Sequence, residues 1–312
     1  MQLQNESIEG AVELYKTTPE FTRKIQSEKT RTQYRYQLTR LCSLKNVGAL
    51  PLTKLNVAKC QQIYWQLLDS VDGDGIRFAN YTLQIVTRAW NVLMRYDILD
   101  KNPWRFVERA KAAPRNTVWV EDDFKLFLTT AFGVPKWRNI GLLVRINVEL
   151  GQRIEDIRLS KWENYNLKQQ LYIREVIKKT KERIPGIPLS DSLTQMLRDQ
   201  KETYNFQEWV VPHPFKLTPY TENNISRTCR KIMDQAGLSS RLQLRDIRRT
   251  VLTDLANCGA TDTEIMSYSG HKSRESLGAY VRISTEQARN AAAKRNFDSE
   301  AFAEVDFKGN HE

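Results

Sequence analysis

The sequence predicts a mainly α-helical protein with two domains, of which the second is an α+β domain with one small hairpin. Three observations support this prediction. Apolar residues recur at helical spacing through most of the chain, and strand-like runs occur only at residues 171–176 and 183–189. Between two helical regions lies a basic, Pro-containing stretch without apolar periodicity, residues 109–118. The length of 312 residues fits two domains of ordinary size.

The first domain is expected over residues 20–108, because the 20 residues before it are polar and too short for a domain. Helices are predicted over residues 27–45, 56–68 and 79–96. The first of them has apolar residues at i, i+4, i+7 and i+8, namely Tyr34, Leu38, Leu41 and Cys42. Asn102 precedes Pro103, and proline disfavours helix in the residue before it, so the domain ends soon afterwards.

The second domain is expected over residues 119–283, after a linker at 109–118 and before a tail at 284–312. The two strand-like runs form a hairpin whose tip is basic, with Lys178, Lys179 and Lys181. Thr261 and Glu264 form a capping box at the start of one helix. The helices are predicted over residues 122–127, 137–150, 153–159, 192–201, 222–236, 245–258, 262–268 and 277–281.

Positive charge is in excess in both domains but not in the tail. The chain has 48 Lys and Arg against 37 Asp and Glu, a net charge of +11. Residues 1–110 contribute +5, residues 111–283 contribute +8 and residues 284–312 contribute −2. A polyanion such as nucleic acid is the partner that this distribution favours.

Several classes of protein are excluded by what the sequence lacks. The four cysteines lie far apart with no CxxC, and there are three histidines, so no metal site or disulfide framework is expected. We expect the cysteines to be small buried hydrophobes in a reducing compartment. No apolar run is long enough to span a membrane, and residues 1–15 lack the apolar core of a signal peptide. A cytoplasmic protein without membrane contact is predicted.

The second domain places arginines at turns, with a lone histidine and a tyrosine beyond them. Arg153 follows a helix stop at Gly151, and three arginines open a helix at residues 245–249. His271 follows Gly270, and Tyr280 stands nine residues later. If these side chains converge, guanidinium groups neutralise the oxygens of a phosphate while the phenol attacks it.

In order and spacing these segments resemble the catalytic domain of the tyrosine recombinases, the family of phage integrases and Xer-type enzymes. Residues 149–157 (ELGQRIEDI) resemble the first arginine box, and residues 246–250 (DIRRT) resemble the second. Residues 269–273 (SGHKS) match the LGH-type box, and Tyr280 occupies the position of the nucleophile. The basic hairpin resembles the segment that carries the mobile lysine of the family.

The resemblance implies a role for each of these residues. Tyr280 would form a 3′-phosphotyrosyl bond with DNA, without metal, ATP or other cofactor. The remaining catalytic residues would be Arg153, Lys179, Arg245, Arg248 and His271, with Asp156 in support. Lys181 is the alternative to Lys179 as the general acid. Further contacts with DNA are expected from Lys29, Arg31, Arg35, Lys178, Arg249 and Lys272.

The sequence departs from the family at Arg245, where the second arginine box normally begins with histidine. Arginine donates hydrogen bonds to phosphate but does not accept a proton, so any duty as general base must lie elsewhere. We interpret this change as tolerated. The alternative is a non-catalytic DNA-binding relative that lost its activity through this substitution.

The family also implies an architecture and partners. A helical, SAM-like core-binding domain and the catalytic domain would form a C-shaped clamp on double-stranded DNA. Four protomers would assemble on DNA from monomers or weak oligomers, with accessory DNA-bending proteins as further partners. The tail at 284–312 would dock on a neighbouring subunit; the alternative is a tail that packs on its own subunit or is disordered. We expect an integrase of a phage or other mobile element, active in viral genome integration and associated with the nucleoid in the bacterial or host-cell cytoplasm. The alternatives are Xer-like dimer resolution and a type IB topoisomerase.

Overall fold

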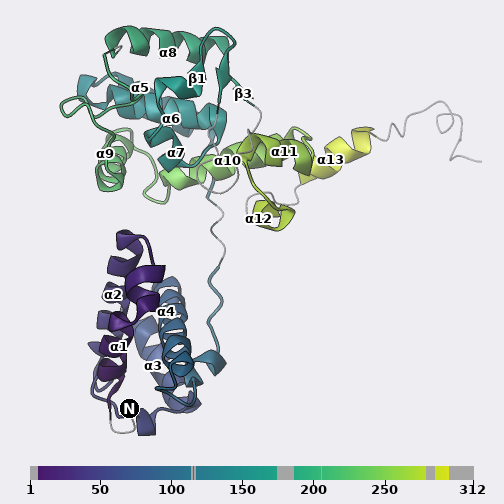
Figure 1. Ribbon diagram of the computed structural model, residues 1–312. Helices are drawn as coiled ribbons and strands as arrows, with labels where there is room; N and C mark the ends of the chain where they lie inside the picture. The colour runs from purple at the N-terminus through teal and green to yellow at the C-terminus, as the bar shows by residue number, and fades with distance from the viewer. Residues whose placement is uncertain are drawn as a thin grey trace, which may run out of the picture. The chain divides into compact units, whose positions relative to one another are not determined.

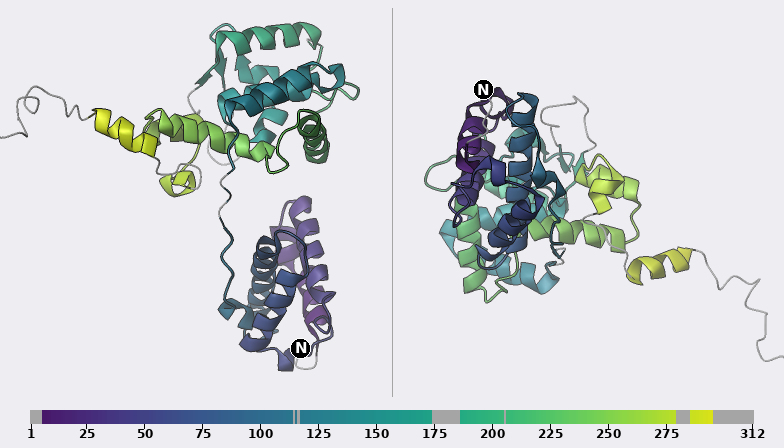
Figure 2. Two further views of the ribbon diagram at one scale, coloured as in Figure 1. Left: turned by 180° about the vertical axis from the view of Figure 1, so that it is seen from behind. Right: turned by 90° about the horizontal axis from the view of Figure 1, so that it is seen from below.

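The computed structural model describes residues 6–113, 115, 117–173, 186–204, 206–278 and 285–294. The chain divides into two compact units, Met1–Arg115 and Asn116–Glu312, whose boundary falls inside the stretch 109–118. Figures 1 and 2 show the helices and strands of each unit. Each unit has its own hydrophobic core. The helices greatly outnumber the short strands among the described residues, which confirms the prediction of a mainly helical protein with a small sheet.

Unit 1 is entirely helical over its described residues. Its α-helices are α1 (Ile8–Thr17), α2 (Glu28–Cys42), α3 (Val57–Asp69) and α4 (Gly75–Arg95), with short turns η1 (Glu20–Lys24), η2 (Leu52–Lys54) and η3 (Pro103–Phe106). The longest helix, α4, buries one apolar stripe against α1, α2 and α3, and Trp90 of this stripe meets Trp104 edge to face at 5.9 Å. Asn102 caps η3 by accepting from the backbone N–H of Trp104 at 3.2 Å.

Helix α1 is the element of unit 1 that the sequence prediction missed. Its residues Ile8, Ala11, Val12 and Tyr15 are buried in the core of the unit. The helix is only ten residues long and its exposed face is polar, so its one apolar stripe was overlooked in a segment that looks polar on average. The domain therefore begins before residue 20, at the N-cap Ser7, which accepts from the N–H of Gly10 at 3.2 Å.

Unit 2 combines helices with a three-stranded antiparallel sheet. Its α-helices are α5 (Glu121–Phe132), α6 (Arg138–Leu150), α7 (Ile154–Arg158), α8 (Asp191–Thr203), α9 (Glu222–Gln235), α10 (Leu244–Asn257), α11 (Asp262–Ser269), α12 (Arg274–Gly278) and α13 (Thr285–Lys294), with short turns η4 (Pro135–Trp137) and η5 (Trp162–Asn164). The prediction of a capping box at α11 is confirmed, because Glu264 and Thr261 exchange hydrogen bonds at 2.7 and 3.3 Å.

The sheet of unit 2 has strands β1 (Tyr165–Asn166), β2 (Leu171–Tyr172) and β3 (Ile187–Pro188) in that order. Tyr172 pairs with Ile187 between β2 and β3, and with Tyr165 between β2 and β1. The antiparallel pairing of β2 and β3 fits the predicted hairpin, while β1 was not predicted. The tip of the hairpin, with all three of its lysines, lies outside the described residues.

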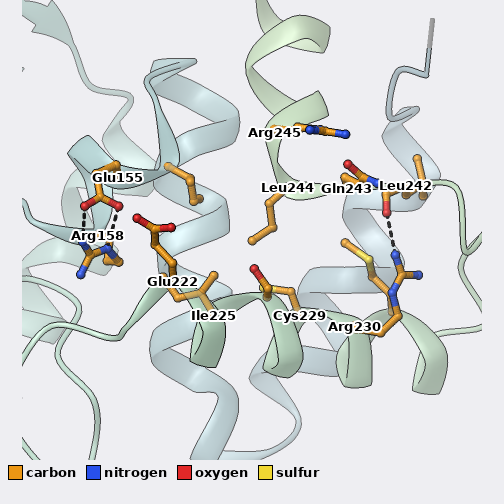
Figure 3. Close-up of a pocket in the computed structure, with 13 residues that line it drawn as sticks. Glu155, Arg158, Glu222, Ile225, Cys229, Arg230, Leu242, Gln243, Leu244 and Arg245 are labelled. Carbon is orange, nitrogen blue, oxygen red and sulfur yellow. Dashed lines mark hydrogen bonds and ion pairs between the residues drawn. The ribbon is translucent and has the colours of Figure 1, made fainter. Parts of the chain in front are cut away.

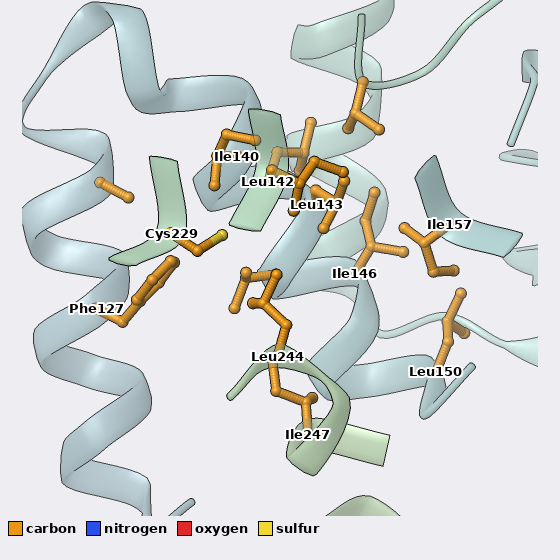
Figure 4. Close-up of a cluster of buried hydrophobic side chains, with 14 of the residues drawn as sticks. Phe127, Ile140, Leu142, Leu143, Ile146, Leu150, Ile157, Cys229, Leu244 and Ile247 are labelled. Carbon is orange, nitrogen blue, oxygen red and sulfur yellow. The ribbon is translucent and has the colours of Figure 1, made fainter. Parts of the chain in front are cut away.

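The core of unit 2 surrounds α6, as Figure 4 shows, with α5 and α10 packed against it. Helix α6 buries residues on several of its faces, among them the polar Asn139 and Asn147. Leu244 and Ile247 of α10 belong to this core. A second, smaller cluster consists of Leu252, Ala256, Ile265 and Leu277, so the two ends of α10 pack into different clusters.

Helix α13 packs against α10 of its own chain, and Nδ2 of Asn290 donates to the carbonyl of Asn257. Among the described residues we find no helix that is long and apolar enough to cross a membrane. The described part of the chain also has no group of three or more His, Cys, Asp and Glu that could hold a metal ion. Cys60 and Cys229 are buried as expected, Cys42 is half-buried, and Cys258, the C-cap residue of α10, is exposed.

Candidate active site

Arg248 is the residue around which the candidate site of unit 2 is built. It lies one turn into α10 and only 4% of its surface is exposed. Its Nη1 donates to the carbonyl oxygen of Gly151 at 3.1 Å, and its Nη2 donates to that of Ser269 at 3.0 Å. A single guanidinium group therefore joins the turn after α6, helix α10 and the turn after α11. These are the three segments that the sequence analysis expected to converge.

Two glycines make this convergence possible. Gly151 ends α6 with a φ of 57°, and Gly270 ends α11 with a φ of 71°, both in the left-handed region that favours glycine. At Gly151 space is also limited, because a Cβ atom would lie 2.7 Å from Cγ1 of Val251 on α10. The turn before Arg153 can therefore approach α10 only with glycine at this position.

His271 follows the second of these turns and is 8% exposed. Its Nδ1 lies 2.7 Å from the hydroxyl oxygen of Ser269. Nη2 of Arg248 lies 3.4 Å from Nδ1 and 3.2 Å from Nε2. Because a donor in the ring plane can be this close to only one of the two nitrogens, the guanidinium group lies over the face of the imidazole. Arg248 and His271 therefore form one packed unit.

The other two predicted arginines differ from Arg248 because they are exposed. Arg153 is the N-cap residue of α7, immediately after the Gly151 turn. Arg245 stands one turn before Arg248, at the start of α10. The backbone of Arg153 is fixed by its carbonyl, which accepts from the N–H groups of Asp156 at 2.9 Å and Ile157 at 3.2 Å. Both exposed arginines are close in sequence to residues that the buried one fixes: Arg153 follows Gly151, which accepts from Arg248, and Arg245 lies on the same helix as Arg248.

A cavity of about 710 Å³ lies beside Arg245, between α7, α9 and the start of α10. In Figure 3, Leu244 points into this space and Arg245 extends to one side of it. Glu155 and Arg158 on its wall form an ion pair, and Nη1 of Arg158 donates to the carbonyl of Tyr220 at 2.6 Å. This pair ties α7, the helix that follows Arg153, to the segment before α9.

The remaining predicted residues of unit 2 differ in how far the structure describes them. Asp156 lies half-buried on α7, Arg249 is half-buried on α10 and Lys272 is exposed after His271. The predicted nucleophile Tyr280 and the lysines Lys178, Lys179 and Lys181 lie outside the described residues.

Sequence reasoning missed two residues that connect the turns. Gln152 is fully buried and donates through Nε2 to the carbonyls of Leu150 at 2.8 Å and Tyr268 at 3.0 Å. The hydroxyl of Tyr268 donates to the carbonyl of Glu149 at 2.5 Å. Burial, with the nearby charge of Glu149 as the second cause, raises the pKa of Tyr268 to about 12, so this phenol remains a donor at neutral pH.

Unit 1 has a cationic groove of its own, which the sequence analysis also missed. The groove has a volume of about 790 Å³ and follows one face of α4. It is lined by the cations Lys24, Arg88, Arg95, Arg105 and Arg109, together with Glu20, Gln84, Thr87, Asn91 and Met94. The acidic member, Glu20, accepts from the hydroxyl of Tyr96 at 2.6 Å and pairs with Lys24 at 3.1 Å. These contacts, that of Tyr96 first, lower the pKa of Glu20 to about 2.

The cations predicted on α2 are placed differently. Arg31 donates to the carbonyls of Thr22 at 3.2 Å and Ile25 at 2.7 Å, and it pairs with Glu28. Arg35 also pairs with Glu28, at 2.8 Å, whereas Lys29 is exposed. Arg31 therefore holds the corner between η1 and α2.

Comparison with known proteins gives consistent matches. The model of a family described as the phage integrase family matches residues 122–287, just over half of the chain. The tyrosine recombinase XerC of Pediococcus pentosaceus is 22% identical over 219 residues, which cover 66% of this chain and 71% of that protein. The putative integrase/recombinase y4qK of Sinorhizobium fredii is 28% identical over 99 residues, 32% of each chain.

Two solved structures have a similar fold. A lambda integrase dimer bound to a COC′ core site has a TM-score of 0.73 at 17% identity, over 90% of this chain and 78% of that chain. The Tn1549 transposon integrase in complex with transposon right end DNA also has a TM-score of 0.73, at 14% identity, over 91% of this chain and 98% of that chain.

Proposed function

The chain belongs to the phage integrase family of tyrosine recombinases, and from this premise we propose that it is a site-specific recombinase that integrates the DNA of a phage or other mobile element. The observation that carries the proposal is the buried pair of Arg248 and His271, held against the turn that presents Arg153. Cations fixed in this way neutralise a phosphate whose charge rises during attack.

The proposed reaction conserves the energy of the phosphodiester bond that is cut. The phenolic oxygen of Tyr280 attacks the scissile phosphorus and gives its proton to His271, and the bond from phosphorus to the 5′ oxygen breaks. Lys179, or Lys181 in its place, gives a proton to the departing 5′ oxygen. The phosphodiester becomes a 3′-phosphotyrosyl ester, so the free 5′-hydroxyl of another strand can reverse the step. This exchange of esters requires neither ATP nor a metal ion.

The arginines divide the binding of the phosphate between them. Arg153 and Arg245 are exposed and can each place a guanidinium fork against non-bridging oxygens. Arg248 is already bonded to two backbone carbonyls, so its first effect is to fix the positive charge and His271 in place. The backbone N–H of Asp156 donates to the carbonyl of Arg153 at 2.9 Å, and its carboxylate would orient the neighbouring cations. Arginine in place of the usual histidine at 245 adds charge rather than a base.

Both units are proposed to bind double-stranded DNA. The groove on α4 supports this for unit 1, because five cations line it and its one carboxylate is already bonded. Contacts with phosphates are expected there and from Lys29 and Arg35, with affinity that falls as salt rises. In unit 2 the same contacts are assigned to Lys178, Arg249 and Lys272.

Assembly and location are part of the same proposal. Exchange between two duplexes requires four active sites, so four protomers act together on DNA, with accessory DNA-bending proteins as further partners and the nucleoid in the cytoplasm as the site of action. The tail at 284–312 would contact a neighbouring subunit. The packing of α13 against its own α10 supports a docking segment that begins only after residue 294.

A nicked suicide substrate tests the proposal, because loss of the short strand traps the covalent complex. Wild-type protein should form an adduct that survives denaturation, and Tyr280→Phe should form none. Tyr204→Phe is the matched control, since Tyr204 is a tyrosine of unit 2 whose hydroxyl accepts from Nδ2 of Asn139 at 3.3 Å and should not be the nucleophile. An adduct with Tyr280→Phe, or none with wild type, contradicts the catalytic proposal and favours a DNA-binding relative without activity.

Xer-like resolution of chromosome or plasmid dimers is the second candidate, favoured by the XerC relative. The two functions differ in their target, so sequencing the cellular DNA that is covalently bound to the wild-type protein separates them. Adducts at a junction between host and element DNA support integration. Adducts at a single chromosomal site without an element support dimer resolution.

A further inference from the structure

Gln152 and Tyr268 connect the two turns that carry Arg153 and His271. Gln152 is fully buried, one residue before Arg153, and Nε2 of its side chain donates across to the carbonyl of Tyr268 at 3.0 Å. Tyr268, three residues before His271, donates back through its hydroxyl to the carbonyl of Glu149 at 2.5 Å. The two segments are therefore joined by a reciprocal pair of hydrogen bonds.

These bonds satisfy backbone groups that helix ends leave without partners. The last carbonyls of a helix have no partner within it, and here the ends of α6 and α11 face each other. At the end of α6, the carbonyl of Glu149 accepts from Tyr268 and that of Leu150 accepts from Gln152. At the end of α11, the carbonyl of Tyr268 accepts from Gln152 and that of Ser269 accepts from Arg248.

The same contacts fix the separation of two proposed catalytic groups. Arg153 is joined to Gln152 directly, and His271 follows Ser269 and Gly270 of the other turn. Arg248 also crosses this gap, with Nη1 on Gly151 and Nη2 on Ser269. Arg248 is itself a proposed catalytic residue, whereas Nε2 of Gln152 and the hydroxyl of Tyr268 donate to backbone carbonyls.

We propose that Gln152 and Tyr268 are positioning residues, which set the distance between Arg153 and His271 for transfer of the phosphate. This inference rests on the proposed recombinase function. Gln152 is the stronger member, because its Nε2 bonds both helix ends. When the bonds are lost, the chain still folds and binds DNA, but the two groups are no longer held for the same phosphate. A misplacement of about 1 Å can slow a reaction by about 10²-fold.

The test uses Gln152→Met, which nearly keeps the length of the side chain and removes its amide, including the Nε2 donor. The rate of covalent complex formation is measured in a single turnover with saturating nicked DNA, at a temperature where circular dichroism shows every variant folded. We expect the rate to fall by about 10- to 100-fold. Affinity for the same DNA, measured in a Tyr280→Phe background that cannot cleave, should change by less than about twofold because phosphate contacts dominate it.

Gln200→Met is the matched control. Gln200 is also a buried glutamine of unit 2, and its Nε2 donates to the carbonyl of Val210 at 2.9 Å and to Oδ1 of Asn139 at 3.1 Å. Its loss should lower the melting temperature as Gln152→Met does, because both leave buried carbonyls unsatisfied. A merely structural role predicts that both variants cleave at the same rate, and that result overturns the inference.

Tyr268→Phe is a second test of the inference, which removes the other hydrogen bond and leaves Gln152 in place. It should slow cleavage less than Gln152→Met, and the double variant should be little slower than Gln152→Met alone, because both act on the same gap. Multiplied effects in the double variant would contradict a shared role, as would a Gln152→Met protein whose loss is entirely in DNA affinity. If the wild type forms no adduct, the proposed function itself fails and the inference falls with it, which is a distinct result.

Discussion

The two units use positive charge in different ways. In unit 1, Arg88, Arg95 and Arg105 line an open groove, where each guanidinium can meet its own phosphate. In unit 2, Arg248 is 4% exposed and its nitrogens bond the backbone of two turns and contact His271. The first arrangement suits binding that is spread over many weak contacts, and the second suits a site that must hold one geometry.

The comparison indicates that exposed cations of this protein contribute to DNA affinity, whereas a buried cation contributes to the geometry of the catalytic site. An exposed cation is screened by salt, and its loss removes roughly one contact. A buried cation that is bonded to carbonyls cannot be lost without disturbing the backbone around it, because those carbonyls are left without partners. Substitutions in the two units should therefore differ in kind as well as in size.

The largest effect is expected from Arg248→Lys. A lysine ammonium is a compact charge that cannot repeat the fork between Gly151 and Ser269, so the charge remains while the geometry is lost. We expect covalent complex formation to slow by about 10²- to 10³-fold at saturating DNA. The rate of adduct formation on a nicked substrate measures this directly.

Arg158→Lys is the control for that experiment. Arg158 is also a largely buried guanidinium of unit 2, bonded to Glu155 and to the carbonyl of Tyr220, but it stands on the wall of the cavity of Figure 3. The Arg158→Lys variant should have a lower melting temperature and a cleavage rate within a few-fold of wild type. Equal losses of rate in the two variants would show that burial alone, rather than position, explains the result.

A middle-sized effect on binding is expected from the double variant Arg88→Ala, Arg105→Ala. Removal of two phosphate contacts should reduce the slope of log affinity against log salt by about 2, and weaken binding on the order of tenfold. Affinity is measured over a series of salt concentrations in the Tyr280→Phe background. The cleavage rate of the otherwise wild-type double variant at saturating DNA should not change.

The control removes the same charge from elsewhere in unit 1. Lys45 and Lys54 are exposed and do not line the groove, so Lys45→Ala, Lys54→Ala should leave the salt slope close to that of wild type. Equal slopes for the two double variants would mean that unit 1 attracts DNA only through its net charge. The groove would then have no special part in binding.

The sequence predicted most of the fold because strong periodicity and helix caps are local signals. Helix α4 was found from its apolar stripe, and α11 from the capping box of Thr261 and Glu264. Helix α1 was missed, since ten residues with one buried face do not stand out in a polar segment. Strand β1 was missed because two residues carry no alternation of their own.

The candidate site was predictable in its order of residues but not in its contacts. The order of the motifs predicted that Arg153, Arg248 and His271 belong to one site. In the structure the turns before Arg153 and His271 both contact the guanidinium group of Arg248. The sequence could not show that Gln152 spans 116 residues to reach Tyr268, since a hydrogen bond to a backbone carbonyl leaves no mark on the partner's side chain. The sequence also could not distinguish an arginine that binds DNA from one, such as Arg31, that bonds backbone carbonyls of its own unit.

Arg31 tests that last distinction and should give the smallest effect. It was predicted from sequence to contact DNA, yet it donates to the carbonyls of Thr22 and Ile25. We expect Arg31→Ala to lower the free energy of unfolding of unit 1 by about 1 kcal/mol, the usual value of such bonds. The salt slope of DNA binding should stay as in wild type, in contrast to the groove variant.

Urea unfolding followed by circular dichroism and the same salt series together decide the role of Arg31. Lys29→Ala is the companion variant, because Lys29 is an exposed cation on the same helix. It should reduce the salt slope by up to about 1 and leave stability nearly unchanged, since exposed charges add little to folding. If Arg31→Ala instead reduces the slope while Lys29→Ala does not, the guanidinium leaves its carbonyls to bind DNA, and burial no longer separates the two uses of charge.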